Sequence, residues 1–231
     1  MKKLLSLAVA SFAFAAMADY TGQTIGVTKI TTTNKNTIVA VPFTSLTNSV
    51  ADISANDLVS TVGLPAETQL QVFKNNQYYG WQLDQNDGWV AVGDQVASSA
   101  DVIANSTVAC GGAIWVVLKN VPATAQDIYI YGDFSEPTTE SSIAADHANL
   151  IANPLQSDAT FALTGAPVKG DMIIIPSDGS AESYSYGRGG WVNNGNSIDL
   201  ASITVKVGQG FWYVSKSTSG VSKIIWSAKS N

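Results

Sequence analysis

The chain has 231 residues, of which 45% are hydrophobic and 13% are charged, and its formal net charge is −6. It contains no cluster of basic residues, which argues against electrostatic binding to nucleic acid or to an anionic membrane surface. Its single cysteine, Cys110, excludes an intramolecular disulfide, so the core must hold the fold. We interpret Cys110 as a small buried residue, and a thiol that cross-links two chains is the alternative.

The first eighteen residues have the pattern of a secretory signal peptide. Lys2 and Lys3 are followed by an apolar stretch, residues 4–14, and by the small-x-small cleavage site Ala16-Met17-Ala18. The apolar stretch is shorter than the roughly 20 residues that a transmembrane helix needs. We therefore expect cleavage after Ala18, no membrane span, and export to the periplasm, the cell surface or the medium.

The rest of the chain reads as strands, because short runs rich in β-branched and aromatic residues alternate with Gly, Asn, Asp and Pro. The predicted strands of the first part are residues 24–31, 37–43, 69–74, 78–83, 89–92, 113–118 and 127–131. Those of the second part are residues 148–153, 171–176, 182–186, 190–192, 202–207, 210–214 and 223–227. The helical signal is weak and is confined to residues 56–62 and the start of 142–151.

Several motifs occur twice, in the same order along the chain. The four pairs are residues 37–43 with 149–155, 63–65 with 165–167, 88–90 with 190–192, and 111–117 with 208–214. Such self-similarity indicates a duplicated module. We predict an all-β protein with two tandem, homologous β-sandwich or barrel-like modules, residues 20–134 and 147–231, joined by a polar linker, residues 135–146. One larger sandwich in which the copies share sheets is the alternative.

Aromatic residues are the best candidates for ligand binding. An indole or phenol face on the surface stacks against a sugar ring, whereas the same residue between two sheets is a core anchor. Trp115 and Trp212 lie within matching apolar strands, so we expect both in the core. The candidate stacking residues are Tyr79, Trp81 and Trp89 with their counterparts Tyr184, Tyr186 and Trp191.

The sequence predicts no catalytic residue, no metal site and no cofactor. His147 is the only histidine, which together with one cysteine is too few for a typical zinc site. There is no Gly-x-Ser-x-Gly elbow and no glycine-rich phosphate-binding loop. Residues 84–88 (Asp-Gln-Asn-Asp-Gly) resemble a calcium loop but lack its terminal Glu, so we interpret them as a hairpin turn.

A hydrolase with a pair of carboxylates stays open as an alternative. Its acids would come from Asp57, Glu67, Asp171 and Glu182.

Two motifs of the second copy resemble those of β-repeat modules in exported bacterial surface proteins. These motifs are residues 149–154 (Asn-Leu-Ile-Ala-Asn-Pro) and 208–212 (Gly-Gln-Gly-Phe-Trp). The first copy departs from the pattern, with Val41 in place of an Asn and Gly112-Ala113 in place of Gln-Gly. The resemblance implies an exported, non-catalytic module.

These observations together predict an exported, non-catalytic surface or extracellular protein with a structural or adhesive role. The alternative is a carbohydrate-binding protein that uses exposed aromatic residues. Its partners would be glycans or other surface proteins, and its oligomeric state is open.

Overall fold

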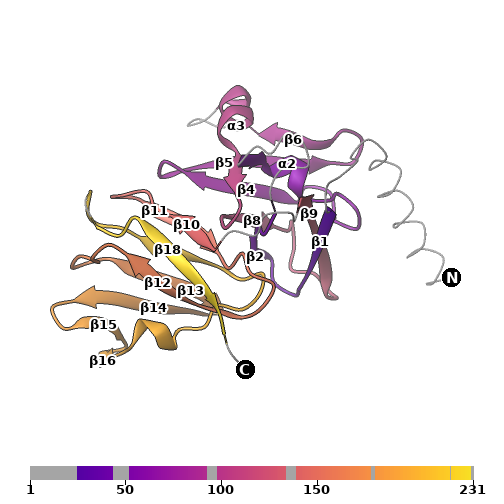
Figure 1. Cartoon of the computed structure of the whole chain (residues 1–231). Coiled ribbons are helices and arrows are strands. Elements are labelled where there is room, and N and C mark those ends of the chain that lie inside the picture. Colours follow the sequence, from indigo (N-terminus) through magenta and orange to yellow (C-terminus); the bar gives the residue numbers. More distant parts are fainter. Residues whose placement is uncertain are drawn as a thin grey trace.

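The computed structural model describes residues 25–43, 52–92, 98–133, 139–177, 180–218 and 220–229, and it is built almost entirely of antiparallel strands (Figure 1). Strands account for 53% of it and helices for 8%, so the predicted all-β class is confirmed. Within these ranges, no helix is long and apolar enough to cross a membrane. The predicted signal peptide and its cleavage site lie outside the described residues.

The first half of the structure, residues 25–133, contains one large sheet and two small ones. The large sheet has the order β2-β8-β4-β5-β6, and the small sheets are the pairs β1-β9 and β3-β7. The bounds are β1 (Ile25–Thr32), β2 (Asn36–Ala40), β3 (Asp52–Ser54), β4 (Gln69–Lys74), β5 (Gln77–Asp84), β6 (Gly88–Val92), β7 (Thr107–Ala109), β8 (Ala113–Val117) and β9 (Gln126–Asp133).

Two short helices also belong to the described part of the first half. The first, α2 (Ala55–Leu58), falls where the weak helical signal was found. The second, α3 (Ser99–Asn105), was not predicted, and it begins with a capping box in which Ser98 and Asp101 bind each other's backbone N–H groups. The Ser-x-x-Asp spacing is the sequence signal that identifies this helix start.

The second half, residues 139–229, contains a large sheet of order β11-β17-β13-β14-β15-β16 and a small sheet of order β10-β18-β12. The bounds are β10 (Glu140–Ser142), β11 (Ala148–Ala152), β12 (Ala159–Thr164), β13 (Met172–Ser177), β14 (Ser180–Gly187), β15 (Gly190–Asn193), β16 (Asn196–Ser197), β17 (Gly210–Val214) and β18 (Lys223–Ala228). The predicted strand at residues 202–207 is wrong. A 3-10 turn (Leu200–Ser202) and a single bridge between Val205 and Ala159 occupy that segment.

Each half has its own hydrophobic core between its large sheet and its small elements, a sandwich-like arrangement. The core of the first half draws on residues 30–130 and that of the second on residues 143–226. Alternation along the central strands decides which side chains enter these cores. Ile114 and Val116 of β8 are buried on either side of Trp115, and Phe211 and Tyr213 of β17 are buried on either side of Trp212.

The second half begins earlier than the sequence indicated. Residues 140–142, part of the predicted linker, form β10 and pair with β18. Ile143 is buried in the second core, and the side chain of Ser141 accepts a hydrogen bond from Trp226 Nε1 at 2.9 Å. The sequence did not predict this strand because its residues are polar. Only alternate residues of an edge strand face the core, so such a strand needs few apolar residues. Residues 135–138 of the predicted linker lie outside the described residues.

The two large sheets also share their strand pairing. Trp115 stands opposite Ile38 on one neighbouring strand and Gln71 on the other. Trp212 stands opposite Leu150 and Ile174 in the same manner. In the outer hairpins, Trp89 is opposite Leu83 and Trp191 is opposite Tyr186. The first five strands of each large sheet therefore follow the same path.

Candidate functional site

Most of the six aromatic residues proposed for sugar stacking are buried. Four of them are at most 8% exposed: Tyr79, Trp81, Tyr184 and Trp191. The other two, Trp89 and Tyr186, are half-buried against the cores. A sugar ring needs an open aromatic face, so the structure contradicts a stacking platform built from these residues. Alternate side chains of each strand point toward the core, and these rings are among them.

The polar ends of the tryptophans are used within the fold. Trp81 Nε1 donates a hydrogen bond to Ser106 Oγ at 2.7 Å, directly after α3. Trp89 Nε1 donates to the backbone oxygen of Val59 at 2.8 Å, directly after α2. Both indoles therefore attach the large sheet to the helices that cover it, which is a structural role.

The four carboxylates considered for a hydrolase lie on different segments of the chain, and three of them have different binding partners. Asp171 is fully buried, and it accepts hydrogen bonds from Tyr213 Oη at 2.9 Å and from the backbone N–H groups of Val168 and Lys216 at 3.1 and 2.8 Å. It thereby ties two loops of the second half together. Burial, followed by the hydrogen bond to Asp171, raises the pKa of Tyr213 far above its usual value.

The other three acids lie on different elements. Glu182 accepts a hydrogen bond from the hydroxyl of Tyr184, and burial together with this carboxylate raises the pKa of Tyr184 to about 12. Glu67 forms an exposed ion pair with Lys119. Asp57 lies on α2. No interaction joins any two of the four, so the structure offers no support for a catalytic pair among them.

The lone histidine and the lone cysteine are placed apart. His147 Nδ1 lies 2.6 Å from the backbone oxygen of Ala145, in the turn before β11. Cys110 is half-buried in the turn between β7 and β8. Among the described residues, no group of three or more His, Cys, Asp or Glu side chains is arranged to hold a metal ion.

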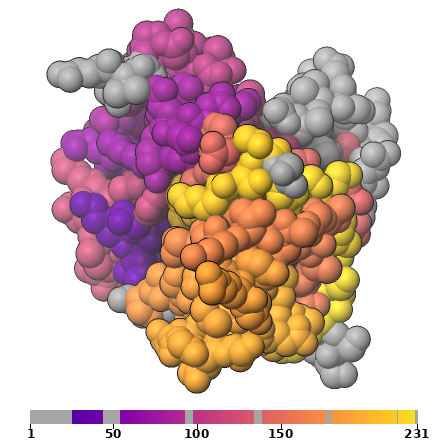
Figure 2. Space-filling model, turned by 90° about the vertical axis from the view of Figure 1, so that its left-hand side faces the viewer, coloured from indigo at the N-terminus to yellow at the C-terminus, as the bar shows by residue number. Residues whose placement is uncertain are grey.

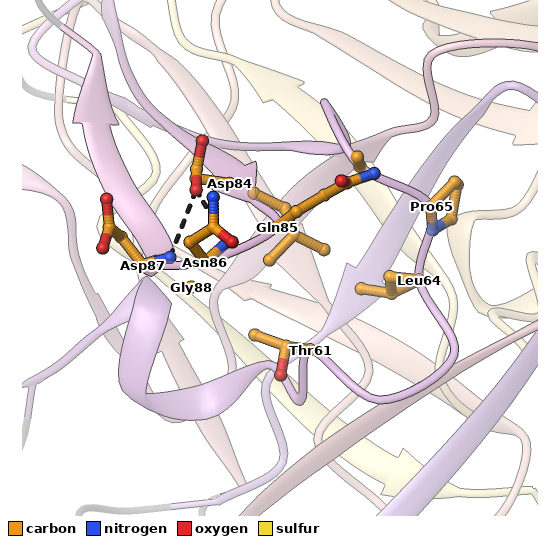
Figure 3. Close-up of a pocket in the computed structure, with 10 residues that line it drawn as sticks. Thr61, Leu64, Pro65, Asp84, Gln85, Asn86, Asp87 and Gly88 are labelled. Atoms are coloured by element: carbon orange, nitrogen blue, oxygen red, sulfur yellow. Dashed lines mark hydrogen bonds between the residues drawn. The ribbon is translucent and has the colours of Figure 1, made fainter.

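A polar pocket of about 930 Å³ lies in the first half, between the turn at residues 84–88 and the loop at residues 61–66. Figure 3 shows Asp84, Asn86 and Asp87 on one side and Leu64 and Pro65 on the other. Asp84 Oδ1 accepts the backbone N–H groups of Asn86 and Asp87, at 2.8 and 3.2 Å, and so closes a hairpin turn. The lining combines the carboxylates of Asp84 and Asp87 and the amides of Gln85 and Asn86 with the apolar side chains of Leu64 and Pro65.

Sequence reasoning missed this pocket because its two walls are far apart in the chain. The turn was correctly interpreted as a hairpin, but nothing in the sequence indicates that residues 61–66 face it. The corresponding turn of the second half is Gly187-Arg188-Gly189-Gly190, which has no acidic or amide side chain. The polar lining is therefore a property of the first half.

Trp115 and Trp212, expected in the cores, lie between the two halves instead. Their ring centroids are 6.3 Å apart, and Phe73 packs edge-on against Trp212 at 4.9 Å. Tyr78 contacts both Phe73 and Trp115, at 4.8 and 6.1 Å. The strands place them here because their neighbours in sequence occupy the inward positions. The prediction of a core role is therefore wrong, because the side chains of each strand alternate between its two faces and these two tryptophans lie on the outward face.

Comparisons with known protein families, with curated proteins and with solved structures gave no match to this chain.

Proposed function

We propose that the protein is an exported, non-catalytic component of the cell surface or extracellular space, built from two tandem homologous modules and having a structural or adhesive role. The common strand path of the two large sheets carries this proposal. Strand order and pairing agree where the repeated motifs lie, including the places of Trp115 and Trp212 and of Trp89 and Trp191. A duplicated scaffold suits a protein that presents surface rather than a single reaction centre.

The small sheets support the same relation. Val59 bridges to Ile130 of β9 in the first half, and Phe161 pairs with Trp226 of β18 in the second. All four side chains are buried in their respective cores. The last strand of each half thus has a buried partner at the same position of its pairing.

The use of the titratable groups supports a non-catalytic role. The buried carboxylate of Asp171 is bound by two backbone N–H groups and one phenol, so its hydrogen-bonding capacity serves the fold. A catalytic carboxylate needs an open position for substrate. Export is supported by the tripartite pattern of residues 1–18.

The export part of the proposal is tested by N-terminal sequencing of the protein recovered from cell fractions. We expect the mature chain to begin at Asp19 in an exported fraction. An Ala18→Arg variant, which removes the small residue at the cleavage site, should be retained as the longer precursor. A wild-type protein that keeps Met1 and stays in the cytoplasm contradicts the proposal.

Carbohydrate binding is the second candidate, and the polar pocket between residues 61–66 and 84–88 now favours it in place of the aromatic platform. A glycan array, followed by titration with tryptophan fluorescence as the readout, tests it. Saturable binding that Asp87→Ala abolishes, while Arg188→Ala in the corresponding turn leaves it intact, establishes the second candidate. Absence of binding, together with filaments or cell-surface labelling, supports the structural role, and turnover of a glycoside or peptide by pure protein contradicts both.

A further inference from the structure

The two halves are joined by backbone contacts that occur in corresponding pairs. Val39 of β2 bridges to Gln209, and the N–H of Ala40 donates to the oxygen of Gly208 at 3.2 Å. In the other direction, Ile151 of β11 bridges to Gly112, and the N–H of Ala152 donates to the oxygen of Gly111 at 3.1 Å. Figure 1 shows the first half (indigo to magenta) beside the second (orange to yellow), and Figure 2 shows the two in contact on one face of the molecule.

The shared strand pairing shows that these contacts are equivalent. Val39 and Ile151 have the same partner position, on β8 and β17 respectively, as do Ala40 and Ala152. The bridge and the hydrogen bond that the first half makes with the second are therefore both repeated by the second half on the first. This reciprocity defines an isologous interface, the kind formed by two copies of one surface about a two-fold axis.

The side chains at the junction also come from corresponding positions of the two halves. A separate buried cluster contains Ala40 and Ala113 from the first half with Leu150 and Ala152 from the second, and Ile38 and Trp212 pack against it. Trp115 and Trp212, which are corresponding residues, contact each other. Small residues in the centre let the two backbones approach closely enough for the bridges to form.

We propose that each half carries a surface that pairs with a second module of the same kind, and that the surface of the second half also fits a second copy of itself. We call it the pairing surface, and it comprises residues 38–40 and 111–113 in the first half and residues 150–152 and 208–210 in the second. Within one chain the two halves satisfy each other. A second half that has lost its partner pairs with another second half. This inference rests on the proposed duplication and adds how the modules associate.

One steric difference makes the pairing selective. A Cβ atom on Gly210 would lie 2.2 Å from Ile38 Cγ2 and 3.2 Å from the backbone oxygen of Ile151, so only glycine fits there beside Ile38. The residue that corresponds to Gly210 is Ala113, and the one that corresponds to Ile38 is Leu150. Two first halves would place Ile38 against Ala113 and clash, whereas two second halves would place Leu150 against Gly210, where there is room.

The pairing is tested in the full chain with a specific protease site inserted between Asp133 and Thr139 and cut after folding. We expect native mass spectrometry to find the cut halves still associated. Gly210→Ala should weaken their association by about tenfold or more, since the added methyl group overpacks the junction against Ile38. The matched variant Ala113→Gly removes only a methyl group from the corresponding position and should weaken association less.

Self-pairing is tested by separating the halves with Ala40→Arg, which buries a charge in the pairing surface of the first half only. After cutting, the second half should appear as a homodimer and the first half as a monomer. A released second half that is monomeric or unfolded overturns the proposal. Separation of the wild-type halves on cutting does so as well, and so do equal effects of Gly210→Ala and Ala113→Gly. None of these outcomes affects the export test, which uses the uncut chain.

Discussion

The two halves of the molecule follow one strand path but fill it with different chemistry. At the position where the first half has Val116, the second has Tyr213, and where the first has Thr68, just before β4, the second has the buried carboxylate of Asp171. The first core is thus closed mainly by apolar packing, with the indole of Trp81 bound to Ser106. The second core contains a hydrogen-bonded acid. The two halves therefore share a strand order without sharing the polarity of their cores.

The halves also differ in how the small sheet is completed. In the second half, β12 runs beside β18 over six residue pairs, from Ala159 to Thr164. In the first half the matching neighbour of β9 makes a bridge at Val59, directly after α2. The first half compensates with the long pairing of β1 and β9, over eight residue pairs, against three for β10 and β18. The small sheet is thus completed mainly by the strand β1 in the first half and mainly by the strand β12 in the second.

The largest expected effect is the loss of a core indole. Trp81→Ala in the first half and Trp226→Ala in the second should each lower the free energy of unfolding by about 3–5 kcal/mol, because each removes a large buried ring. Denaturant titration followed by circular dichroism measures the change, and hydrogen exchange should locate it in the mutated half.

The matched control for these variants is Trp115→Ala. This side chain is half-buried between the halves, so the loss of stability should be smaller and should fall on the association of the halves. If Trp115→Ala destabilises the first core as much as Trp81→Ala, the assignment of Trp115 to the junction is wrong.

The second prediction concerns the buried acid, which has no counterpart in the first half. Tyr213→Phe keeps the ring but removes the donor to Asp171, so it should cost about 1–3 kcal/mol of stability, as expected for a hydrogen bond to a buried charge. Tyr186→Phe, at a half-buried ring of the same sheet, is the control and should cost less. Thermal unfolding of both variants measures the difference, and equal costs would show that the Asp171 hydrogen bond contributes little.

How far the sequence predicted the fold is clearest on β8 and β17. Glycines followed by apolar and aromatic residues located both strands correctly, but period-two alternation alone does not say which face is the core. The sequence predicts Trp115 and Trp212 in the core because they lie within matching apolar strands. The structure instead places Ile114, Val116, Phe211 and Tyr213 on the inward face. The outward face needed a partner surface to be explained, and that partner is the other half.

The pocket and the early beginning of the second half at β10 were not predicted for a different reason. The pocket walls are brought together by tertiary structure, so no local pattern of residues 61–66 or 84–88 reveals it. Strand β10 is three residues of Glu and Ser whose pairing with β18 overrides their low strand propensity. Short edge elements such as these are specified by the sheet they join.

The third prediction is a pH dependence located in the second half. The pKa of Tyr184 is raised by burial and by Glu182 to about 12, above its usual value near 10. A raised pKa means that folding favours the protonated phenol. The contribution to stability is therefore complete below pH 10 and is lost as the pH rises through about 12. Stability measured from pH 9 to 12.5 should fall less steeply in Tyr184→Phe than in the wild type. Identical pH profiles would contradict a folded-state shift at this residue.

The smallest expected effect comes from an ion pair that both halves place on corresponding strands with opposite polarity. Lys29 of β1 binds Asp127 of β9 at 3.0 Å, and Glu140 of β10 is bound by Lys223 of β18 at 2.6 Å. The register aligns Lys29 with Glu140 and Asp127 with Lys223, since Ile128 and Ile224 are the buried residues next to each pair. Such exposed pairs contribute little, and salt weakens them.

Lys29→Glu and Asp127→Lys should each lower the midpoint temperature of thermal unfolding slightly, by less than any variant above. The double variant, which reproduces the arrangement of the second half, should recover most of the loss. In 1 M salt, where the screening length is about 3 Å, the differences should shrink toward zero. A double variant no better than the worse single variant would show that the two strand pairs are not interchangeable at this position.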